Sequence, residues 1–333
     1  RFLFYLPIFF SAILVVVLWF FSFRHGRYIG AVISCTLIAL CPSLIPRSCA
    51  GWFDKDVLNL IFPLLIIWTY ILAHIALTMR KRLIWLCVSS ILVGLFCFTW
   101  AAWWFVFLII VTYEFIYLGW ILFRRTFYGR YNGDLLRRHL FSLSVFLVFS
   151  FFWVVVFSGF MPLWVLLIEV KKSIILSKAV AKSIWPNVYA TVGELKKSNL
   201  KEIIVSAGGV YIFIPSVFAL FFLLIRNLFW PKADPFKRES VIMLALWSVG
   251  MFYACFQGVR FAVFLLVPLS ICLGWFVIDL YEYLKAKGMK LPAVFMVLVI
   301  LVSLFVSSVN TANKVSRSIF TLMNDTWYKV LNL

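Results

Sequence analysis

Residues 261–280 read FAVFLLVPLSICLGWFVIDL, and Asp279 is the one charged residue among them. An α-helix needs about 20 apolar residues to cross the hydrocarbon core of a bilayer, whereas a membrane-spanning β-strand needs about half as many. A helix also satisfies its backbone hydrogen bonds within the segment, as the interior of a membrane requires. The stretch therefore predicts a transmembrane helix, and the same pattern recurs along the chain.

Nine further apolar runs lie at 2–22, 28–45, 57–79, 83–100, 102–123, 140–168, 203–225, 240–256 and 292–309. The 140–168 run is long for one crossing, and we expect it to continue as an interfacial or re-entrant piece. The 333 residues are 65% hydrophobic and 13% charged, whereas soluble domains are nearer half apolar and a quarter charged. The sequence therefore predicts an all-α polytopic membrane protein with about ten transmembrane helices and excludes a soluble globular fold.

The chain has 31 Lys and Arg against 12 Asp and Glu, a net charge of +19. Basic residues are concentrated in alternate connections between the apolar runs, at 24–27, 80–82, 124–138, 226–238 and 285–290. Loops rich in Lys and Arg stay on the cytoplasmic side and attract anionic lipid head groups. We therefore interpret the charge as cytoplasmic loops in contact with membrane lipids, and we expect no nucleic-acid partner.

Counting crossings from these cytoplasmic loops puts several polar residues on the opposite, external face. They are Asp54, Asp56, Glu194, Arg260 and the C-terminal tail. The long loop 169–202 is external by the same count, although it carries seven lysines. A long external loop is less bound by the charge rule. The prediction of function depends on this convergence at one face.

Other polar residues have ordinary interpretations. Three acidic residues sit in predicted basic cytoplasmic loops, namely Asp134, Asp234 and Glu239. Glu114 lies inside the 102–123 run, where an unpaired charge is costly, so we expect a buried structural hydrogen bond. The three histidines, at 25, 74 and 139, are far apart and lack the spacing of a zinc motif.

Asp54 and Asp56 flank Lys55 immediately before the 57–79 run. Two carboxylates at this spacing in a loop can turn toward one hard cation, and Mg²⁺ or Mn²⁺ prefers such oxygen ligands. Aspartates at the start of a helix also interact favourably with the helix dipole, so a solvated pair is the other interpretation. The residues alone leave both open.

Glu194 and Arg260 are the remaining external candidates. Glu194 can supply a third oxygen ligand from the 169–202 loop, or it is an ordinary charged residue beside Lys196 and Lys197. Arg260 follows a very short turn between two runs, where it can extend toward the head groups. It can also grip the oxygens of a lipid phosphate in two-pronged fashion.

Four segments together resemble one family. They are RSCAGWFDKD at 47–56, TVGE at 191–194, GVRF at 258–261 and MNDTWY at 323–328. In this order they resemble the catalytic subunit of oligosaccharyltransferase, the C-type glycosyltransferase that N-glycosylates proteins. The match of the first segment to the family is fairly specific, whereas T-x-x-E alone is weak evidence for membership. The resemblance covers most of the chain.

The resemblance implies a metal-dependent enzyme that moves an oligosaccharide from a polyprenyl or dolichyl (di)phosphate lipid to Asn in Asn-x-Ser/Thr. Its partners are then lipid-linked oligosaccharide, an acceptor polypeptide and membrane lipids, and its cofactor is Mn²⁺ or Mg²⁺. By the same resemblance, Asp56 and Glu194 are catalytic, and Asp54, Asp56 and Glu194 hold the metal. Arg260, assisted by Arg47, binds the lipid phosphate. The active site faces outward from the plasma membrane of a prokaryote.

Two features of the family have no counterpart here. One is an earlier span with an external loop that carries another metal-ligand Asp, and the other is a soluble C-terminal domain with a Trp-Trp-Asp-Tyr-Gly motif. We therefore expect a chain truncated at both ends and inactive alone. Residues 1–310 would be its transmembrane domain, with catalytic external loops. Residues 311–333 would be an external tail that begins the missing domain.

Two other functions remain open. Another C-type glycosyltransferase would use a polyprenyl-phosphate sugar on a hydroxyl or a lipid, without dependence on Asn-x-Ser/Thr. A lipid transporter would place charged residues or Gly/Pro breaks near mid-span, yet Glu114 is the main acidic residue inside a run. The glycan, the lipid length, mono- versus diphosphate, an archaeal or bacterial source and the subunit partners are not specified by the sequence.

Overall fold

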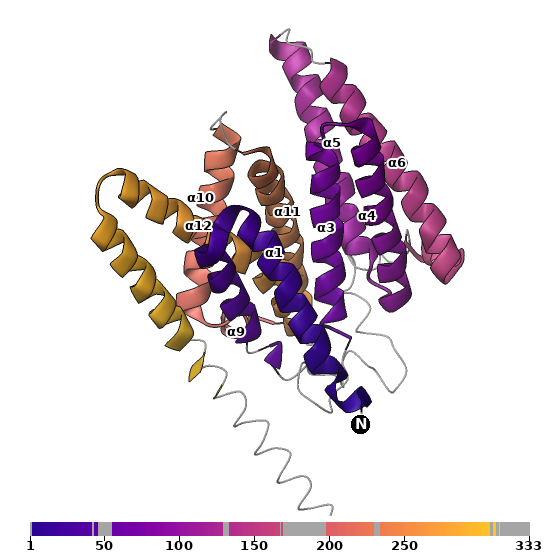
Figure 1. Cartoon of the computed structure of the whole chain (residues 1–333). Helices are drawn as coiled ribbons and strands as arrows, with labels where there is room; N and C mark the ends of the chain where they lie inside the picture. Colours follow the sequence, from indigo (N-terminus) through magenta and orange to yellow (C-terminus); the bar gives the residue numbers. More distant parts are fainter. Residues whose placement is uncertain are drawn as a thin grey trace, which may run out of the picture. The chain divides into compact units, whose positions relative to one another are not determined.

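The computed structural model describes residues 2–41, 43–45, 55–128, 133–166, 168, 198–229, 234–306, 309–310 and 313. Within these residues the regular structure is helical, and eight helices are long and apolar enough to cross a membrane. The all-α membrane fold is thereby confirmed (Figure 1). The chain divides into two compact units. Unit 1 comprises 1–57, 192–225 and 251–333, and unit 2 comprises 58–191 and 226–250.

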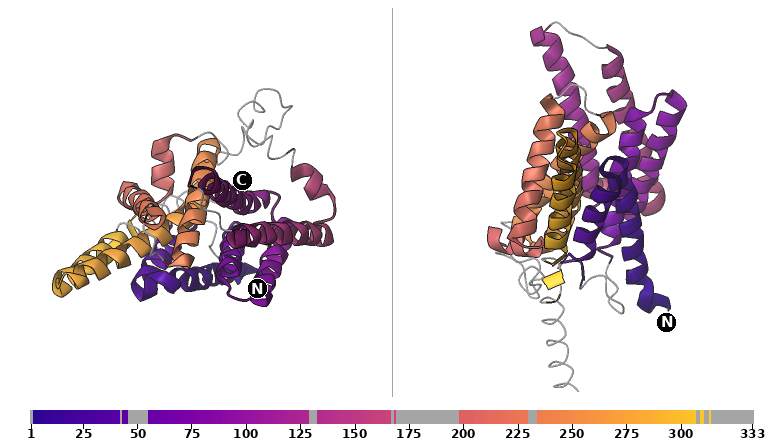
Figure 2. Two further views of the ribbon diagram at one scale, coloured as in Figure 1. Left: turned by 90° about the horizontal axis from the view of Figure 1, so that it is seen from above. Right: turned by 60° about the vertical axis from the view of Figure 1, so that its left-hand side comes forward.

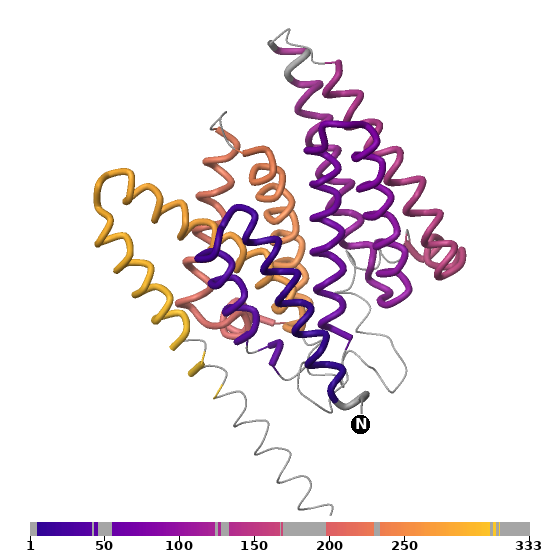
Figure 3. Tube along the Cα trace, viewed as in Figure 1, coloured from indigo at the N-terminus to yellow at the C-terminus, as the bar shows by residue number. Residues whose placement is uncertain are grey.

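Helix α1 (Phe2–Ala39) is a helical hairpin rather than one straight helix. Arg27 lies at its turn with φ 48° and ψ −154°, far from helical values, and the trace reverses direction there (Figure 3). The hydroxyls of Ser22 and Ser34, one on each half, lie 2.9 Å apart and join the two halves. The two predicted spans 2–22 and 28–45 thus correspond to the two halves of α1.

Helix α12 (Ala262–Ala286) is the central helix of unit 1, and residues 262–275 are all buried. Both halves of α1 pack against it. The Trp275 indole N–H donates to the Ser22 carbonyl at 2.9 Å, and the Ser34 hydroxyl donates to the Ser270 carbonyl at 3.1 Å. Phe218, on helix α10 (Val210–Phe229), contacts the ring of Phe276 edge-on.

Unit 2 contains α3 (Leu58–Ile75), α4 (Met79–Thr99), α5 (Trp104–Tyr128), α6 (Gly133–Ser158) and the first part of α11 (Pro235–Gln257). Helix α4 packs against both α3 and α6, as the two further views also show (Figure 2). Gly94 permits the close approach of α4 to α6, because a Cβ there would lie 2.7 Å from the Cβ of Trp153. This bundle of short-connected helices holds the buried polar groups described below.

Two predicted runs contain breaks that hydropathy does not reveal. The 203–225 run is split by Gly208 and Gly209, whose φ angles of 98° and 90° interrupt the helix. The first piece, α9 (Leu200–Ser206), begins inside the predicted 169–202 loop, because Asn199 and Glu202 form a capping box there. In the 140–168 run, Gly159 at φ 77° follows α6, and residues 161–166 are helical again. The expected additional piece is therefore a separate short helical segment.

The last predicted span, 292–309, corresponds to a helix at Lys290–Val306. A 3-10 turn, η3 (Val259–Phe261), connects α11 to α12. This turn carries Arg260, which leads to the candidate site.

Candidate active site

Asp56 and Arg260, two of the residues that the sequence singles out, form a two-pronged ion pair in unit 1. The Arg260 Nε donates to Oδ2 of Asp56 at 3.2 Å, and Nη2 donates to Oδ1 at 2.6 Å. This fork-to-fork arrangement is the strong form of an Arg–carboxylate contact. The Asp56 side chain is 1% exposed and that of Arg260 is 32% exposed. The carboxylate of Asp56 is therefore buried within the protein, whereas the guanidinium of Arg260 remains partly exposed.

The position of Arg260 follows from the short connection in which it sits. Helix α11 ends at Gln257, and the N–H of Gly258 donates to the carbonyl of Ala254 at 3.1 Å. Gly258 is extended and starts η3, so only one turn separates α11 from α12. The guanidinium is therefore held by backbone that two long helices fix.

The last residues of the predicted 169–202 loop contact the same turn. The N–H of Ser198 donates to the Phe256 carbonyl at 3.3 Å, and its hydroxyl donates to the carbonyl of Cys255. Helix α9 then packs against η3 and α12. The end of the 169–202 loop and the α11–α12 turn thus lie together in unit 1. This agrees with the prediction that both segments face the same side of the membrane.

Arg47, Asp54 and Glu194 lie outside the described residues, so their predicted roles stay predictions. The donor type of Asp56 fits a hard divalent cation. A carboxylate offers about four lone-pair positions, and Mg²⁺ and Mn²⁺ prefer such oxygen ligands.

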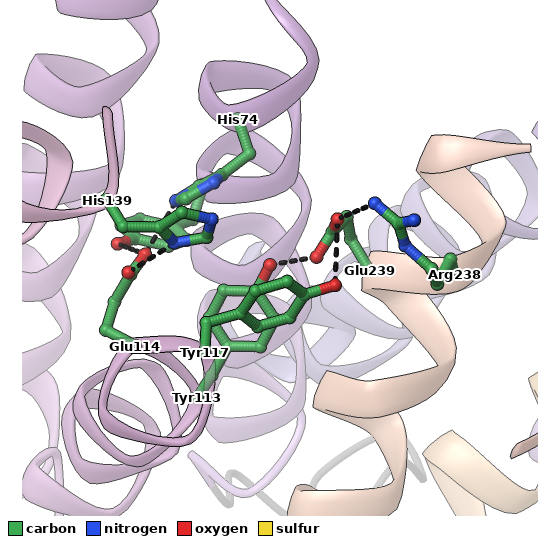
Figure 4. A network of polar contacts seen from close by, with 8 residues as sticks. His74, Tyr113, Glu114, Tyr117, His139, Arg238 and Glu239 are labelled. Atoms are coloured by element: carbon green, nitrogen blue, oxygen red, sulfur yellow. Dashed lines mark hydrogen bonds and ion pairs between the residues drawn. The ribbon is translucent and has the colours of Figure 1, made fainter. Parts of the chain in front are cut away.

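A second polar cluster lies buried in unit 2, around Glu114 of α5 (Figure 4). His139 of α6 places Nδ1 2.8 Å from Oε2 of Glu114, and His74 of α3 places Nε2 2.6 Å from Oε1. The Tyr70 hydroxyl also donates to Oε1, at 2.5 Å. The predicted buried hydrogen bond of Glu114 is confirmed. The sequence spacing of His74 and His139 did not predict that they lie close together.

The prediction that Glu239 sits in a loop is wrong. Glu239 lies inside α11 and is only 6% exposed. The helix starts at Pro235, earlier than hydropathy indicates, because the Asp234 carboxylate accepts from the Phe236 N–H at 3.2 Å. Tyr113 and Tyr117 both donate to Glu239, the latter at 3.2 Å (Figure 4). The carboxylate therefore joins α11 to α5 within unit 2.

A family model described as the N-terminal part of the oligosaccharyl transferase STT3 matches residues 1–323. The chain belongs to the STT3 family of oligosaccharyl transferases. The resemblance drawn from the four sequence segments is confirmed. The match covers the hairpin α1, both units and the turn that carries Arg260.

The relatives that this chain matches are considerably longer than the chain. A dolichyl-phosphooligosaccharide-protein glycotransferase of Methanococcus voltae is 25% identical over 309 residues, which are 85% of this chain and 34% of the relative. The oligosaccharyltransferase of Archaeoglobus fulgidus in its apo form matches with a TM-score of 0.63 and 15% identity, over 94% of this chain and 45% of that one. The oligosaccharyltransferase AglB from Archaeoglobus fulgidus, in complex with an inhibitory peptide and a dolichol-phosphate, matches with a TM-score of 0.60 and 16% identity, over 94% of this chain and 44% of that one. The chain therefore spans less than half the length of these relatives and shares the fold of their membrane part.

Proposed function

We propose that the protein containing this chain transfers an oligosaccharide from a polyprenyl or dolichyl (di)phosphate lipid to Asn in Asn-x-Ser/Thr. STT3 family membership supports the reaction class, and a relative is named for the same transfer. A structure of similar fold contains a peptide and a dolichol-phosphate. The observation that carries the proposal for this chain is the contact between Asp56 and Arg260.

The reaction requires the residue types found there. An amide nitrogen is a poor nucleophile because its lone pair is delocalised into the carbonyl. A carboxylate that accepts hydrogen bonds from the acceptor N–H groups weakens that delocalisation, and we assign this role to Asp56 and Glu194. The leaving group is an anionic lipid phosphate, whose oxygens match the guanidinium fork of Arg260. A bound Mn²⁺ or Mg²⁺ would offset the charge that develops on this phosphate.

In the proposed site, Asp54, Asp56 and Glu194 hold the cation, and Arg47 assists Arg260. Sequence distance supports this set. Asp54 is two residues from Asp56, and Glu194 is four residues before Ser198, which is bound to the carbonyls of the α11–α12 turn. Four residues of extended chain reach at most about 14 Å. Both carboxylates are therefore close in sequence to residues that lie at the candidate site.

Each member of the ion pair has a role in the proposed reaction. The guanidinium of Arg260 would hold the lipid phosphate, and the carboxylate of Asp56 would supply oxygen ligands to the cation. Arg260 is 32% exposed, so a phosphate can approach it without unfolding the turn.

The placement in the cell is part of the same proposal. The basic connections at 80–82, 124–138 and 285–290 favour the cytoplasmic side, so Asp56 and Arg260 would face outward from a prokaryotic plasma membrane. Residues 1–310 would form the transmembrane domain and residues 311–333 an external tail that leads into a further domain. That further domain would recognise the acceptor.

The test uses membranes that contain the protein produced from its complete gene. Extracted lipid-linked oligosaccharide, Mn²⁺ and a fluorescent Asn-x-Thr peptide are supplied, and a shift of the peptide on a gel is measured. We expect a shift that disappears with EDTA and with a Gln-x-Thr peptide. If glycan instead passes to a Ser hydroxyl or to lipid, or if Gln-x-Thr is modified equally, the proposal is wrong.

A further inference from the structure

We propose that His74, Glu114 and His139 form a binding site for a divalent transition metal, with zinc as the best match. The site is separate from the cation of the proposed transfer reaction. The three side chains each offer one ligand atom, and these atoms all lie within 4.8 Å of one another. They come from three different helices, α3, α5 and α6, so a bound ion would join three elements of unit 2.

The burial of the cluster suits a metal rather than solvated charges. The side chains of His74, Glu114 and His139 are 9%, 0% and 4% exposed. A buried carboxylate is costly unless a cation or hydrogen bonds compensate it. With both imidazoles neutral the three groups carry a charge of −1, which a divalent cation would offset and turn to +1. The alternative compensation is a proton held by a histidine, and the experiment below separates the two.

The orientation of His74 favours the metal. Its Nε2 lies 2.6 Å from a Glu114 oxygen, yet among the described residues this nitrogen makes no hydrogen bond of acceptable geometry. A protonated imidazole would be expected to aim its N–H at the carboxylate, because directed bonds are the stronger ones. A nitrogen that is close but misaligned leaves its lone pair for another partner.

The surroundings provide the outer contacts that fix metal ligands. The Tyr70 hydroxyl holds Oε1 of Glu114 at 2.5 Å. The Tyr117 ring stacks on the His139 ring, with centroids 4.8 Å apart and an angle of 14° between the planes. Such contacts orient ligands and raise metal affinity. The neighbouring cation Arg82 is engaged elsewhere, because it donates to the carbonyls of Ala73 and Ala76 at the end of α3.

The types of ligand atom in the cluster indicate which metal would bind. Two imidazoles and one carboxylate suit zinc, whereas Mg²⁺ and Mn²⁺ prefer oxygen ligands such as those proposed around Asp56. Tetrahedral zinc with bonds of about 2.0–2.1 Å needs ligand atoms about 3.3 Å apart. The two histidine nitrogens lie 2.6 Å and 2.8 Å from different oxygens of Glu114, Oε1 and Oε2. For tetrahedral zinc, each of these two pairs would have to move apart by about 0.5–0.7 Å, which small rotations supply.

The test measures zinc in the purified protein, produced from its complete gene in zinc-supplemented medium and passed through gel filtration. Elemental analysis should give one tightly bound zinc per chain. His74→Gln and His139→Gln should each weaken zinc binding by more than about 100-fold, since losing only an outer contact already costs about 10–100-fold. The chain offers a matched control in its third histidine. His25→Gln, in unit 1, should keep the zinc, and so should Asp56→Asn at the proposed catalytic site.

X-ray absorption on the unmutated zinc protein gives a second measurement that does not depend on any variant folding. It should find two imidazole ligands and at least one oxygen at about 2.0 Å. The proposal is overturned if the folded protein takes up no zinc, if the spectrum lacks two imidazoles, or if Asp56→Asn rather than His139→Gln releases the metal. Glycan transfer that persists without zinc leaves the proposed function intact, so the two proposals fail separately.

Discussion

Arg260 grips both carboxylate oxygens of Asp56, although 204 positions separate the two residues in the sequence. The contact ties the turn after α11 to the segment just before α3. It also pairs a group suited to phosphate with a group suited to a divalent cation. Within the pair the two opposite charges balance each other.

Replacing Arg260 by Lys tests whether donor binding needs the planar shape of the guanidinium as well as its positive charge. Lysine keeps the positive charge but lacks the planar fork that matches two phosphate oxygens. We expect the KM for the lipid donor to rise about 10-fold or more, which corresponds to about 1.4 kcal/mol, while the KM for the peptide changes little. Initial transfer rates at varied donor concentration measure this.

The matched control is Arg27→Lys. Arg27 also pairs with a carboxylate of unit 1, that of Glu282, but the pair is exposed. This variant should leave both KM values unchanged. An equal loss of donor affinity in both variants would mean that general positive charge, not the fork of Arg260, attracts the lipid.

Asp56→Asn should impair both stability and transfer, and a double variant separates the two effects. Asn cannot balance the Arg260 charge, so we expect a lower melting temperature in detergent and a loss of about 1–3 kcal/mol. Adding Arg260→Gln removes the uncompensated charge and should restore part of that stability. Transfer should stay at least 100-fold low in both variants, because neither retains the carboxylate. Recovery of transfer in the double variant would show that the uncompensated charge of Arg260 caused the loss, and that transfer needs neither side chain.

The membrane architecture was predictable from the sequence because apolar length is a direct physical requirement for crossing a bilayer. The apolar runs 2–22 and 28–45 predicted the two halves of the α1 hairpin, which are joined by a turn at Arg27. The break at Gly208 and Gly209 was missed, because a hydropathy average is insensitive to two residues of positive φ. The signals for it were present in the sequence, as the Gly-Gly pair itself and as the capping residues Asn199 and Glu202.

The candidate site was predictable only in part. Alternating loop charge placed Asp56 and Arg260 on one face, but their direct contact depends on how α12 and its neighbours pack. The histidine cluster could not be found by spacing, because its ligands come from three helices rather than from one short motif. Glu239 was misplaced because Asp234 caps α11 earlier than the apolar run begins.

Glu239→Gln tests the buried link between α11 and α5. The carboxylate accepts from Tyr113 and Tyr117, and Arg238 donates to it at 3.0 Å. An amide keeps one acceptor oxygen and presents an NH₂ group where the second acceptor was. We expect a loss of about 1–2 kcal/mol, the upper range for hydrogen bonds inside membrane bundles, measured as a shift in the midpoint of unfolding in detergent.

Glu282→Gln is the comparison for that variant. Its side chain is 42% exposed and that of its partner Arg27 is 70% exposed, so solvent screens the pair and its removal should change stability by less than about 0.5 kcal/mol. Equal shifts in the two variants would contradict a specific role for the buried carboxylate.

Gly274→Ala should strongly destabilise the packing of α1 against α12 in unit 1. A Cβ on Gly274 would lie 2.4 Å from the carbonyl oxygen of Gly30 and 2.7 Å from the hydroxyl of Ser34. Backbone cannot move aside as a flexible side chain can, so α12 and α1 would have to separate. Overpacking of this kind costs about 1–3 kcal/mol, and we expect a clear fall in the melting temperature. Gly119→Ala on α5 is the control, because nothing lies within 4 Å of a Cβ there and alanine favours a helix by about 1 kcal/mol over glycine. A Gly274→Ala protein as stable as the Gly119→Ala protein would mean that α1 and α12 do not cross at Gly30 and Gly274.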